Sequence, residues 1–411
     1  MDSNQIRKDF PILKRTMSDH PLIYMDNSAT TLKPQPVIDA VMNYYTYLGA
    51  NAHRGDYEMS AQVDQAFEGA RKTAQKFINA KYTEEIVFTS GSTQGLNEVA
   101  LMLAHDKLKD GDVILTDEAE HASSILPWMM ASKRLEIRYI PLDDQGKITM
   151  ENVRKVMDET VKVICVAHVS NVLGFEAPVK GMAAFAHSYG AYMIVDGAQS
   201  APHLPIDVQD MDMDFFVLSA HKMCGPTGIG ILYGKKDLLE SLNPVYYGGE
   251  SNARFYKNGV VTLKHTPWKF ESGTQPIEGA IGMAAAMDYL TAIGKENIHA
   301  YEWELKQYFL SKVEKMDTIK LYNATSQSGI CTFNVLDHGK LIPAQDVASF
   351  LNTKGIAVRS GQHCAKLLPD VIGAFGTCRA SFYIYNTKEE IDTLVEALQE
   401  ATLENCVNIF F

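Results

Sequence analysis

The feature that most constrains the fold is an alternation of short apolar runs with helix-like segments between residues 83 and 234. The apolar runs include EEIVFT, DVILTD, LEIRYIPL, VKVICVAHVS, AYMIVD, DFFVLS and GIGILYG, and helical patterns cover 95–109 and 181–189. Continuous apolar strands that alternate with helices indicate a mainly parallel α/β sheet with helices on both faces. Such a sheet carries its functional residues at the carboxyl ends of its strands.

Two of these expected strands end in residues that carry chemistry. Asp196 follows the run AYMIV, and Lys222 ends the sequence SAHK that follows FFVL. A lysine amine forms a Schiff base with pyridoxal phosphate (PLP), and a carboxylate pairs with the pyridinium nitrogen of that cofactor. Solvent-facing polar residues are the alternative for Asp196 alone. The combination with Gln199 and His221 favours a PLP site.

The charge and composition of the whole chain exclude several classes of partner. The 411 residues carry a net charge of −12, which opposes binding to nucleic acid or to an anionic membrane, because both need a basic surface. No apolar run approaches the ~18 residues that span a bilayer, and the start MDSNQIRKDF lacks the apolar core of a secretory signal. We therefore expect a cytoplasmic protein whose six cysteines stay reduced and are mostly buried.

A loop of small residues, SGSTQG, follows the run EEIVFT and opens a helix. Its backbone N–H groups and the hydroxyls of Ser92 and Thr93 lie at a helix N-terminus, which favours an anion. Simple helix capping is the alternative. No Gly-Lys-Ser/Thr ending occurs, so the loop is not a nucleotide-binding P-loop. Upstream of Asp196 and Lys222, we interpret it as the binding site for the phosphate of PLP.

His121 and Asn171 also follow expected strands of this sheet. An imidazole at that edge stacks on a flat cofactor ring or transfers protons near neutral pH. The Asn171 amide donates to the phenolic oxygen of the cofactor or to a substrate carboxylate. A structural histidine and a turn asparagine are the alternatives, since Gly174 suggests a turn after Asn171.

The C-terminal part holds a candidate nucleophile and a candidate anion ligand. Cys364 lies beside His363 and near Arg359, and positive neighbours lower a thiol pKa below its usual ~8.5. Burial of Cys364 is the alternative, and a metal site is not expected because no second ligand pair has suitable spacing. Arg379 lies within the apolar run CRASFYIYN and needs an anion, either a substrate α-carboxylate or an internal acid.

The remaining chain divides into segments of different character. Residues 243–274 are rich in loops, a helical stretch runs from 276 to about 316, and the tail mixes strands with helices. We expect a large PLP-binding domain over 17–290 and a smaller α+β domain over 291–411. Residues 1–16 are expected to pack with the smaller domain.

Taken in order, the motifs SGST, EAEHAS, HVSNVLG, VDGAQS, SAHKMCGPTGIG and RSGQHCA resemble those of class V aminotransferase-fold enzymes. The resemblance is specifically to the SUF-type (group II) cysteine desulfurases and selenocysteine lyases, and it extends from MDNSATTLKP and NAHRG to RASFYIYNTKEEID. It implies a PLP-dependent transferase of fold type I that acts as a homodimer. It also implies conversion of L-cysteine to L-alanine, with the sulfur held as a persulfide and passed to an acceptor protein of the SUF system for iron–sulfur cluster assembly.

The resemblance implies a role for each matching residue. Lys222 binds the cofactor aldehyde, Asp196 pairs with its ring nitrogen, His121 stacks over the ring and assists proton transfer, and Cys364 accepts the sulfur. Further cofactor contacts are expected from Ser92, Thr93, Asn171, Gln199, Ser219, His221 and Thr274. Of these, Thr274 is expected to contact the cofactor phosphate from the other subunit. Substrate contacts are expected from Asn171, Arg359, Arg379, His53 and Arg54, the last two across the dimer interface.

The chain departs from the family pattern at two places near the nucleophile. Gln362 stands where many relatives carry a second histidine, and KLLP over 366–369 replaces a more usual Gln-Pro. The short spacing between Cys364 and Arg379 favours the group II type. Two alternatives stay open: a selenocysteine lyase or other PLP-dependent β-eliminating lyase, and a catalytically silent PLP-fold scaffold for sulfur transfer. The presence of both Lys222 and Cys364 argues against the scaffold.

Overall fold

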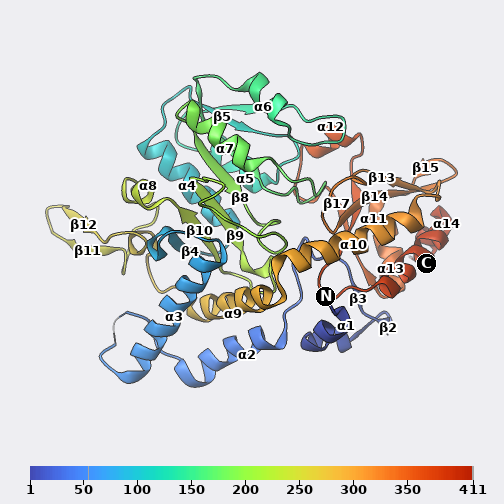
Figure 1. Cartoon of the computed structure of the whole chain (residues 1–411), viewed down its shortest axis with the longest axis horizontal. Helices are drawn as coiled ribbons and strands as arrows, with labels where there is room; N and C mark the ends of the chain where they lie inside the picture. The colour runs from blue at the N-terminus through green and yellow to red at the C-terminus, as the bar shows by residue number, and fades with distance from the viewer. Residues whose placement is uncertain (54, 410–411) are drawn as a thin grey trace.

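A computed structural model of the chain describes residues 1–53 and 55–409. Its centre is a seven-stranded sheet flanked by helices (Figure 1). In spatial order the strands are β4 (Ile86–Thr89), β10 (Gly230–Gly234), β9 (Phe215–Ser219), β8 (Tyr192–Asp196), β7 (Val161–Ala167), β5 (Val113–Thr116) and β6 (Glu136–Tyr139). Strand β10 runs antiparallel to β4 and β9, whereas the other pairs are parallel. The prediction of a mainly parallel α/β sheet is confirmed.

Both faces of this central sheet are buried from β4 to β5, which explains why these strands are largely apolar, whereas the edge strand β6 is only partly buried. Successive side chains of a strand point to opposite faces, so Ile114 and Leu115 belong to two different cores. One core is closed by α4 (Ser92–Asp106), α5 (Ala122–Met129) and α8 (Lys236–Glu240). The other is closed by α2 (Gln35–Asn43), α3 (Glu58–Phe77), α6 (Met150–Val156), α7 (Val179–Ser188) and α9 (Ile277–Ile293).

A second sheet is formed by the C-terminal part of the chain. It contains β13 (Ile319–Leu321), β14 (Ile330–Asp337), β18 (Thr377–Ser381), β17 (Arg359–Gly361) and β15 (Lys340–Leu341). Helices α10 (Lys295–Val313), α11 (Ala344–Thr353) and α13 (Lys388–Glu400) pack around its core, and α12 (Leu368–Ile372) and α14 (Leu403–Asn408) complete this part. The helical stretch expected from 276 to about 316 is two helices, α9 and α10, because Gly294 between them has a φ of +88°.

The N-terminal segment runs beside the C-terminal sheet. It contains α1 (Ser3–Ile6), β1 (Thr16–Met17), β2 (His20–Pro21) and β3 (Ile23–Tyr24). Strand β3 pairs in parallel with β16 (Ile356–Ala357), and Arg7 forms a 2.6 Å ion pair with Glu390 of α13. The expected domain boundary at 290 falls inside α9, and the domain division stays a prediction.

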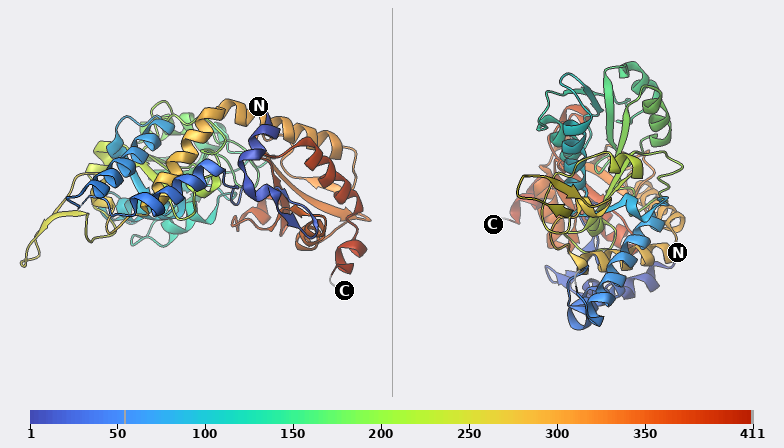
Figure 2. Two further views of the ribbon diagram at one scale, coloured as in Figure 1. Left: turned by 90° about the horizontal axis from the view of Figure 1, so that it is seen from below. Right: turned by 90° about the vertical axis from the view of Figure 1, so that its left-hand side faces the viewer.

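The loop-rich region expected over 243–274 contains a hairpin that the sequence did not predict. Strands β11 (Asn252–Phe255) and β12 (Val261–Leu263) pair antiparallel and project from the end of the molecule opposite the C-terminus (Figures 1 and 2). Neither strand has a buried face, so no alternation of apolar and polar residues marks it. Among the described helices, none has the length and apolar character that crossing a bilayer requires.

Candidate active site

A cavity of about 550 Å³ lies where the carboxyl ends of the central strands meet the C-terminal sheet. Most of the predicted site residues line it: Ser92, Thr93, His121, Asn171, Asp196, Gln199, Ser219, His221, Lys222, Arg359, Cys364 and Arg379. These residues come from segments far apart in the sequence. The sheet topology brings them together, as expected for residues that follow parallel strands.

Asp196 is the last residue of β8, and Lys222 ends the short helical turn Ala220–Lys222 that follows the neighbouring strand β9. Asp196 is buried, and its Oδ1 accepts the backbone N–H of Ala198 at 2.9 Å. Burial lowers the pKa of the Lys222 amine below its ordinary value and Arg379 lowers it further, while Asp196 acts in the opposite direction. Within the described residues, the Lys222 Nζ donates no hydrogen bond. A lowered pKa leaves more of the amine unprotonated at neutral pH, and the unprotonated form is the one that attacks an aldehyde.

The start of α4 forms one wall of the cavity. The backbone N–H of Ser92 donates to Ser219 Oγ at 2.8 Å, and that hydroxyl donates to Ser92 Oγ at 3.0 Å. A 2.8 Å hydrogen bond joins Thr93 Oγ1 and Ser123 Oγ. Gly91 has a φ of +145°, which side chains rarely adopt, and a Cβ there would make a tight 3.0 Å contact with Ser219 Oγ. Hydroxyls and a helix N-terminus therefore face the same space, an arrangement suited to a phosphate.

His121 caps the N-terminus of α5, where its Nδ1 accepts the backbone N–H of Ser123 at 3.2 Å. Burial lowers the pKa of His121, and the charge of Lys222 lowers it further. The ring is therefore neutral near pH 7. Because Nδ1 accepts a hydrogen bond, the proton is on Nε2.

Arg379 lies on β18 and is 2% exposed. Its Nη1 donates to the carbonyl oxygen of Asn171 at 2.7 Å, whereas its Nε has no partner among the described residues. Burial lowers the pKa of Arg379 to about 10, so the guanidinium still carries its charge at neutral pH. A buried cationic donor without a partner marks a place for an anion.

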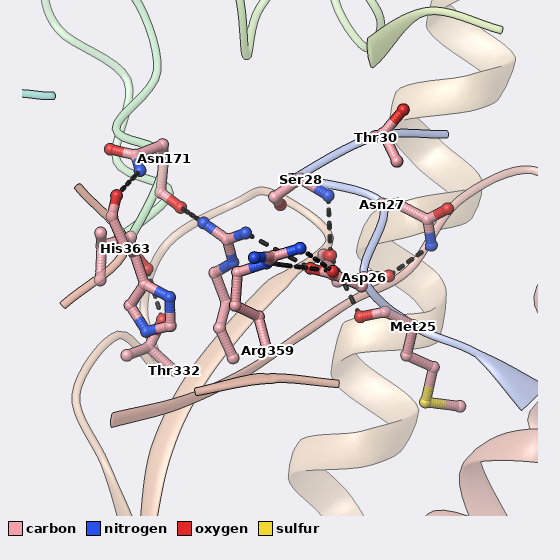
Figure 3. Close-up of polar contacts among 12 residues, drawn as sticks. Met25, Asp26, Asn27, Ser28, Thr30, Asn171, Thr332, Arg359 and His363 are labelled. Atoms are coloured by element: carbon pink, nitrogen blue, oxygen red, sulfur yellow. Dashed lines mark hydrogen bonds and ion pairs between the residues drawn. The ribbon is translucent and has the colours of Figure 1, made fainter. Parts of the chain in front are cut away.

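Asp26 contacts both arginines of the cavity. It accepts hydrogen bonds from Arg359 Nε at 3.0 Å and Nη2 at 2.6 Å, and it lies 3.6 Å from Arg379 Nη2 (Figure 3). The sequence left two alternative partners for Arg379, an internal acid and a substrate carboxylate. Arg379 can have both, because Asp26 is the internal acid and leaves a donor of Arg379 unused. Asp26 takes the Nε and Nη2 donors of Arg359 and leaves Arg379 Nε free.

The loop that carries Cys364 is fixed at the rim of the cavity. All six cysteines are within the described residues, and Cys364 is the exposed one. The backbone N–H of Ala122 donates to the carbonyl oxygen of Cys364 at 2.9 Å, and Asn171 Nδ2 donates to the carbonyl oxygen of His363 at 2.8 Å (Figure 3). Asn171 therefore ties the loop to the cavity through its side-chain amide. Gln362 accepts a hydrogen bond from Lys366 at 2.7 Å.

The expected influence of His363 on Cys364 is wrong. His363 is buried, and a 2.9 Å hydrogen bond joins its Nε2 to Thr377 Oγ1. Burial, together with the charge of Arg379, lowers the pKa of His363 to about 3. A neutral ring supplies no positive charge to stabilise a Cys364 thiolate. The sequence showed that His363 lies next to Cys364, but it did not show that His363 is buried.

Two predicted residues within the described part of the chain, His53 and Thr274, do not line the main cavity. His53 and Thr274 line a separate small cavity, where Asn51 Nδ2 donates to Thr274 Oγ1 at 3.4 Å. Arg54 lies outside the described residues. The contribution of these residues to a partner subunit stays a prediction.

Comparisons with known proteins place this site in a family. The profile of the aminotransferase class-V family matches residues 23–394. The chain belongs to this family. It is 44% identical over 402 residues to a probable cysteine desulfurase of Halalkalibacterium halodurans, covering 97% of this chain and 98% of the relative. It is 43% identical over 419 residues to a cysteine desulfurase of Haloferax volcanii, covering 98% and 97%. The apo structure of a cysteine desulfurase from Thermococcus onnurineus NA1 superimposes with a TM-score of 0.90, at 36% identity, over 97% of both chains.

The class-V aminotransferase family is PLP-dependent, and the cavity fits that cofactor. Lys222 supplies the amine, Asp196 the carboxylate for the ring nitrogen, and the start of α4 the anion site. Gln199 donates from Nε2 to the carbonyl oxygen of Ser28 at 2.7 Å, while its buried Oε1 has no partner among the described residues. An unpartnered buried oxygen in a cavity wall is expected where a bound group completes the site.

Asp26, Ser28 and Ser123 were not predicted as site residues from the sequence. Ser28 and Ser123 line the cavity, and Asp26 holds Arg359. Asp26 directly follows the apolar run LIYM. That is the same signal, an acid at a strand end, that pointed to Asp196, so it was available in the sequence.

Proposed function

We propose that this class-V enzyme is a cysteine desulfurase that converts L-cysteine to L-alanine and holds the sulfur as a persulfide on Cys364. One observation carries the proposal: a single cavity is lined by a partly buried amine, a buried guanidinium and an exposed thiol, from Lys222, Arg379 and Cys364. These are the groups that a PLP-dependent enzyme needs to bind an amino acid and to accept its sulfur.

Arg379 binds the α-carboxylate of L-cysteine. The support is its unpartnered Nε, together with the hydrogen bond from Nη1 to the Asn171 carbonyl, which fixes the plane of the guanidinium. A carboxylate at this buried cation forms charge-assisted hydrogen bonds that exclude water from the reacting end of the substrate.

PLP, when bound at Lys222 and Asp196, draws electrons away from the substrate α-carbon and so permits loss of the α-proton. Lys222 and His121 serve the proton transfers. The Lys222 amine has a lowered pKa and accepts a proton at Nζ, whereas the neutral His121 ring holds a proton at Nε2. The two groups therefore offer one acceptor and one donor in the same cavity.

Cys364 performs the sulfur transfer. Its thiolate attacks the sulfur of L-cysteine, so that a sulfur–sulfur bond forms as the bond between sulfur and Cβ breaks. The electron pair of the broken bond stays on Cβ, which takes up a proton and becomes the methyl group of L-alanine. The exposed position of Cys364 leaves the resulting persulfide open to a second acceptor.

The proposal also covers the oligomeric state of the enzyme, its sulfur acceptor and its location in the cell. The enzyme acts as a cytoplasmic homodimer of the group II type and passes sulfur to an acceptor protein of the SUF system. His53, Arg54 and Thr274 contribute to the partner subunit's site, which is consistent with the position of His53 and Thr274 outside the main cavity. The short spacing between Cys364 and Arg379 supports the group II type.

The test compares purified holoenzyme with its Cys364→Ala variant on L-cysteine, measuring L-alanine and protein-bound persulfide. The variant is expected to keep the cofactor absorbance and to lose L-alanine production. Cys406→Ala, at a buried thiol of α14, is the matched control. Unchanged turnover of L-cysteine by Cys364→Ala would remove this thiol from the mechanism. Turnover of L-selenocysteine alone would favour a lyase.

A further inference from the structure

Two like charges lie directly opposite each other beside the cavity. Strands β17 and β18 pair antiparallel with Arg359 opposite Arg379, and both side chains line the cavity. Like charges in directly opposite positions of a sheet repel each other and destabilise the pairing. Water screens the charge of Arg359, whose side chain is 48% exposed, better than the charge of Arg379, whose side chain is 3% exposed.

Asp26 supplies the counter-charge and is rigidly held. The segment around it is tied to β18, the strand that carries Arg379. The N–H of Ser381 donates to the Met25 carbonyl at 2.8 Å, the N–H of Ser28 donates to Ser381 Oγ at 2.9 Å, and Asn27 Nδ2 donates to the Ser381 carbonyl at 2.6 Å (Figure 3). The Asp26 carboxylate therefore keeps a fixed position relative to both arginines.

The contacts of Asp26 divide the two arginines between two tasks. Arg359 gives both its Nε and its Nη2 to Asp26, at 3.0 and 2.6 Å. Arg379 reaches Asp26 only at 3.6 Å and keeps an unpartnered Nε. Two guanidinium groups and one carboxylate leave one net positive charge, which matches a ligand with one carboxylate.

We propose that Asp26 is a specificity-determining positioning residue that restricts this site to amino acids with a single carboxylate. This inference rests on the proposed function, because it takes Arg379 as the ligand of the substrate carboxylate. An amino acid with a second carboxylate, such as L-aspartate, finds Arg359 already paired and meets the negative charge of Asp26. Without that charge, the half-exposed Arg359 side chain is free to bind the second carboxylate.

The test is the Asp26→Asn variant, which keeps the shape of the side chain and removes its charge. Binding of L-alanine and of L-aspartate to the holoenzyme is measured by titration calorimetry. The ratio of the dissociation constant for L-aspartate to that for L-alanine is expected to fall about tenfold, as for a new charge-assisted contact. Asp158→Asn is the matched control, since it removes a carboxylate from the surface pair with Arg138, 2.8 Å apart.

A second test compares Arg359→Gln with the double variant Arg359→Gln/Asp26→Asn. In Arg359→Gln, Asp26 has only Arg379 as its cationic partner and competes for its donors, so L-alanine is expected to bind about tenfold more weakly. Adding Asp26→Asn to Arg359→Gln removes the competitor and restores L-alanine binding. A purely structural role for Asp26 predicts no such restoration.

The outcomes separate this inference from the proposed function. An unchanged ratio in folded, cofactor-loaded Asp26→Asn, or no restoration in the double variant, would overturn the role of Asp26 while the wild-type protein still turns over L-cysteine. Wild-type holoenzyme that neither binds L-alanine nor turns over L-cysteine would instead overturn the proposed function, and the inference with it.

Discussion

The backbone N–H of Ala122 donates a 2.9 Å hydrogen bond to the carbonyl oxygen of Cys364. This bond links the start of α5, which His121 caps, to the loop that carries the exposed thiol. His363 and Cys364 have φ values of +53° and +60°, a backbone conformation that costs about 1–2 kcal/mol for each residue that is not glycine. The loop therefore depends on hydrogen bonds to its neighbours to keep the thiol at the cavity.

A second hydrogen bond to this loop runs from Asn171 Nδ2 to the His363 carbonyl at 2.8 Å, and Asn171→Ala removes it. We expect faster amide hydrogen exchange over residues 361–366 and L-alanine production lowered about tenfold, the effect of losing about 1.4 kcal/mol of positioning. The cofactor should remain bound. Asn297→Ala, which removes an exposed bond to the Ile293 carbonyl, is the control. Unchanged exchange in the loop would contradict this role.

Ser219→Ala removes the acceptor of the Ser92 N–H and a hydroxyl of the cavity wall. A hydrogen bond to a charged group contributes about 1.5–3 kcal/mol, so the dissociation constant for PLP should rise at least about tenfold. Absorbance titration of the apoenzyme measures it. Ser241→Ala, at an exposed hydroxyl after α8, should leave the affinity unchanged. Equal affinity of both variants for PLP would argue against a phosphate site at α4.

The low pKa of His363 predicts a pH dependence of stability. Burial lowers this pKa from 6.5 to about 3, so between these values the unfolded chain binds a proton that the folded protein does not. Stability from this group is fully present above about pH 6.5 and is lost as the pH falls, by at most about 1.4 kcal/mol per pH unit.

The comparison with His363→Gln isolates this contribution from the other groups that titrate in the same range. The thermal unfolding midpoint of the wild type should exceed that of the variant by a margin that shrinks between about pH 7.5 and about pH 5.5. A margin that stays constant or grows on acidification would show that His363 takes up a proton in the folded protein.

The central sheet was predictable because burial on both faces leaves a direct trace in the sequence. The runs around Ile114, Ile164 and Ile194 are continuously apolar, since each strand is covered on both sides. The hairpin of β11 and β12 has no buried face and leaves no such trace. The residues at the strand ends were also predictable, because Asp196 directly follows an apolar run and Lys222 ends the short SAHK sequence after another.

Features that depend on long-range packing were not predictable. His363 is buried and contacts Thr377 of β18, which the local sequence around His363 does not show. The contact between Asp26 and Arg359 joins residues more than three hundred positions apart. The Asn171 amide holds the Cys364 loop, a contact that the sequence did not show, while its contact with cofactor or substrate stays a prediction. In each case the local sequence shows the residue type but not the neighbour that determines its role.

The account depends most directly on the covalent attachment of PLP to Lys222. Reduction of the holoenzyme with borohydride, followed by proteolysis and mass spectrometry, locates that attachment. The account predicts the reduced pyridoxyl group on the peptide that contains Lys222, and its absence from that peptide in Lys222→Ala. A label on another lysine, or no label in protein that turns over L-cysteine, would contradict the account.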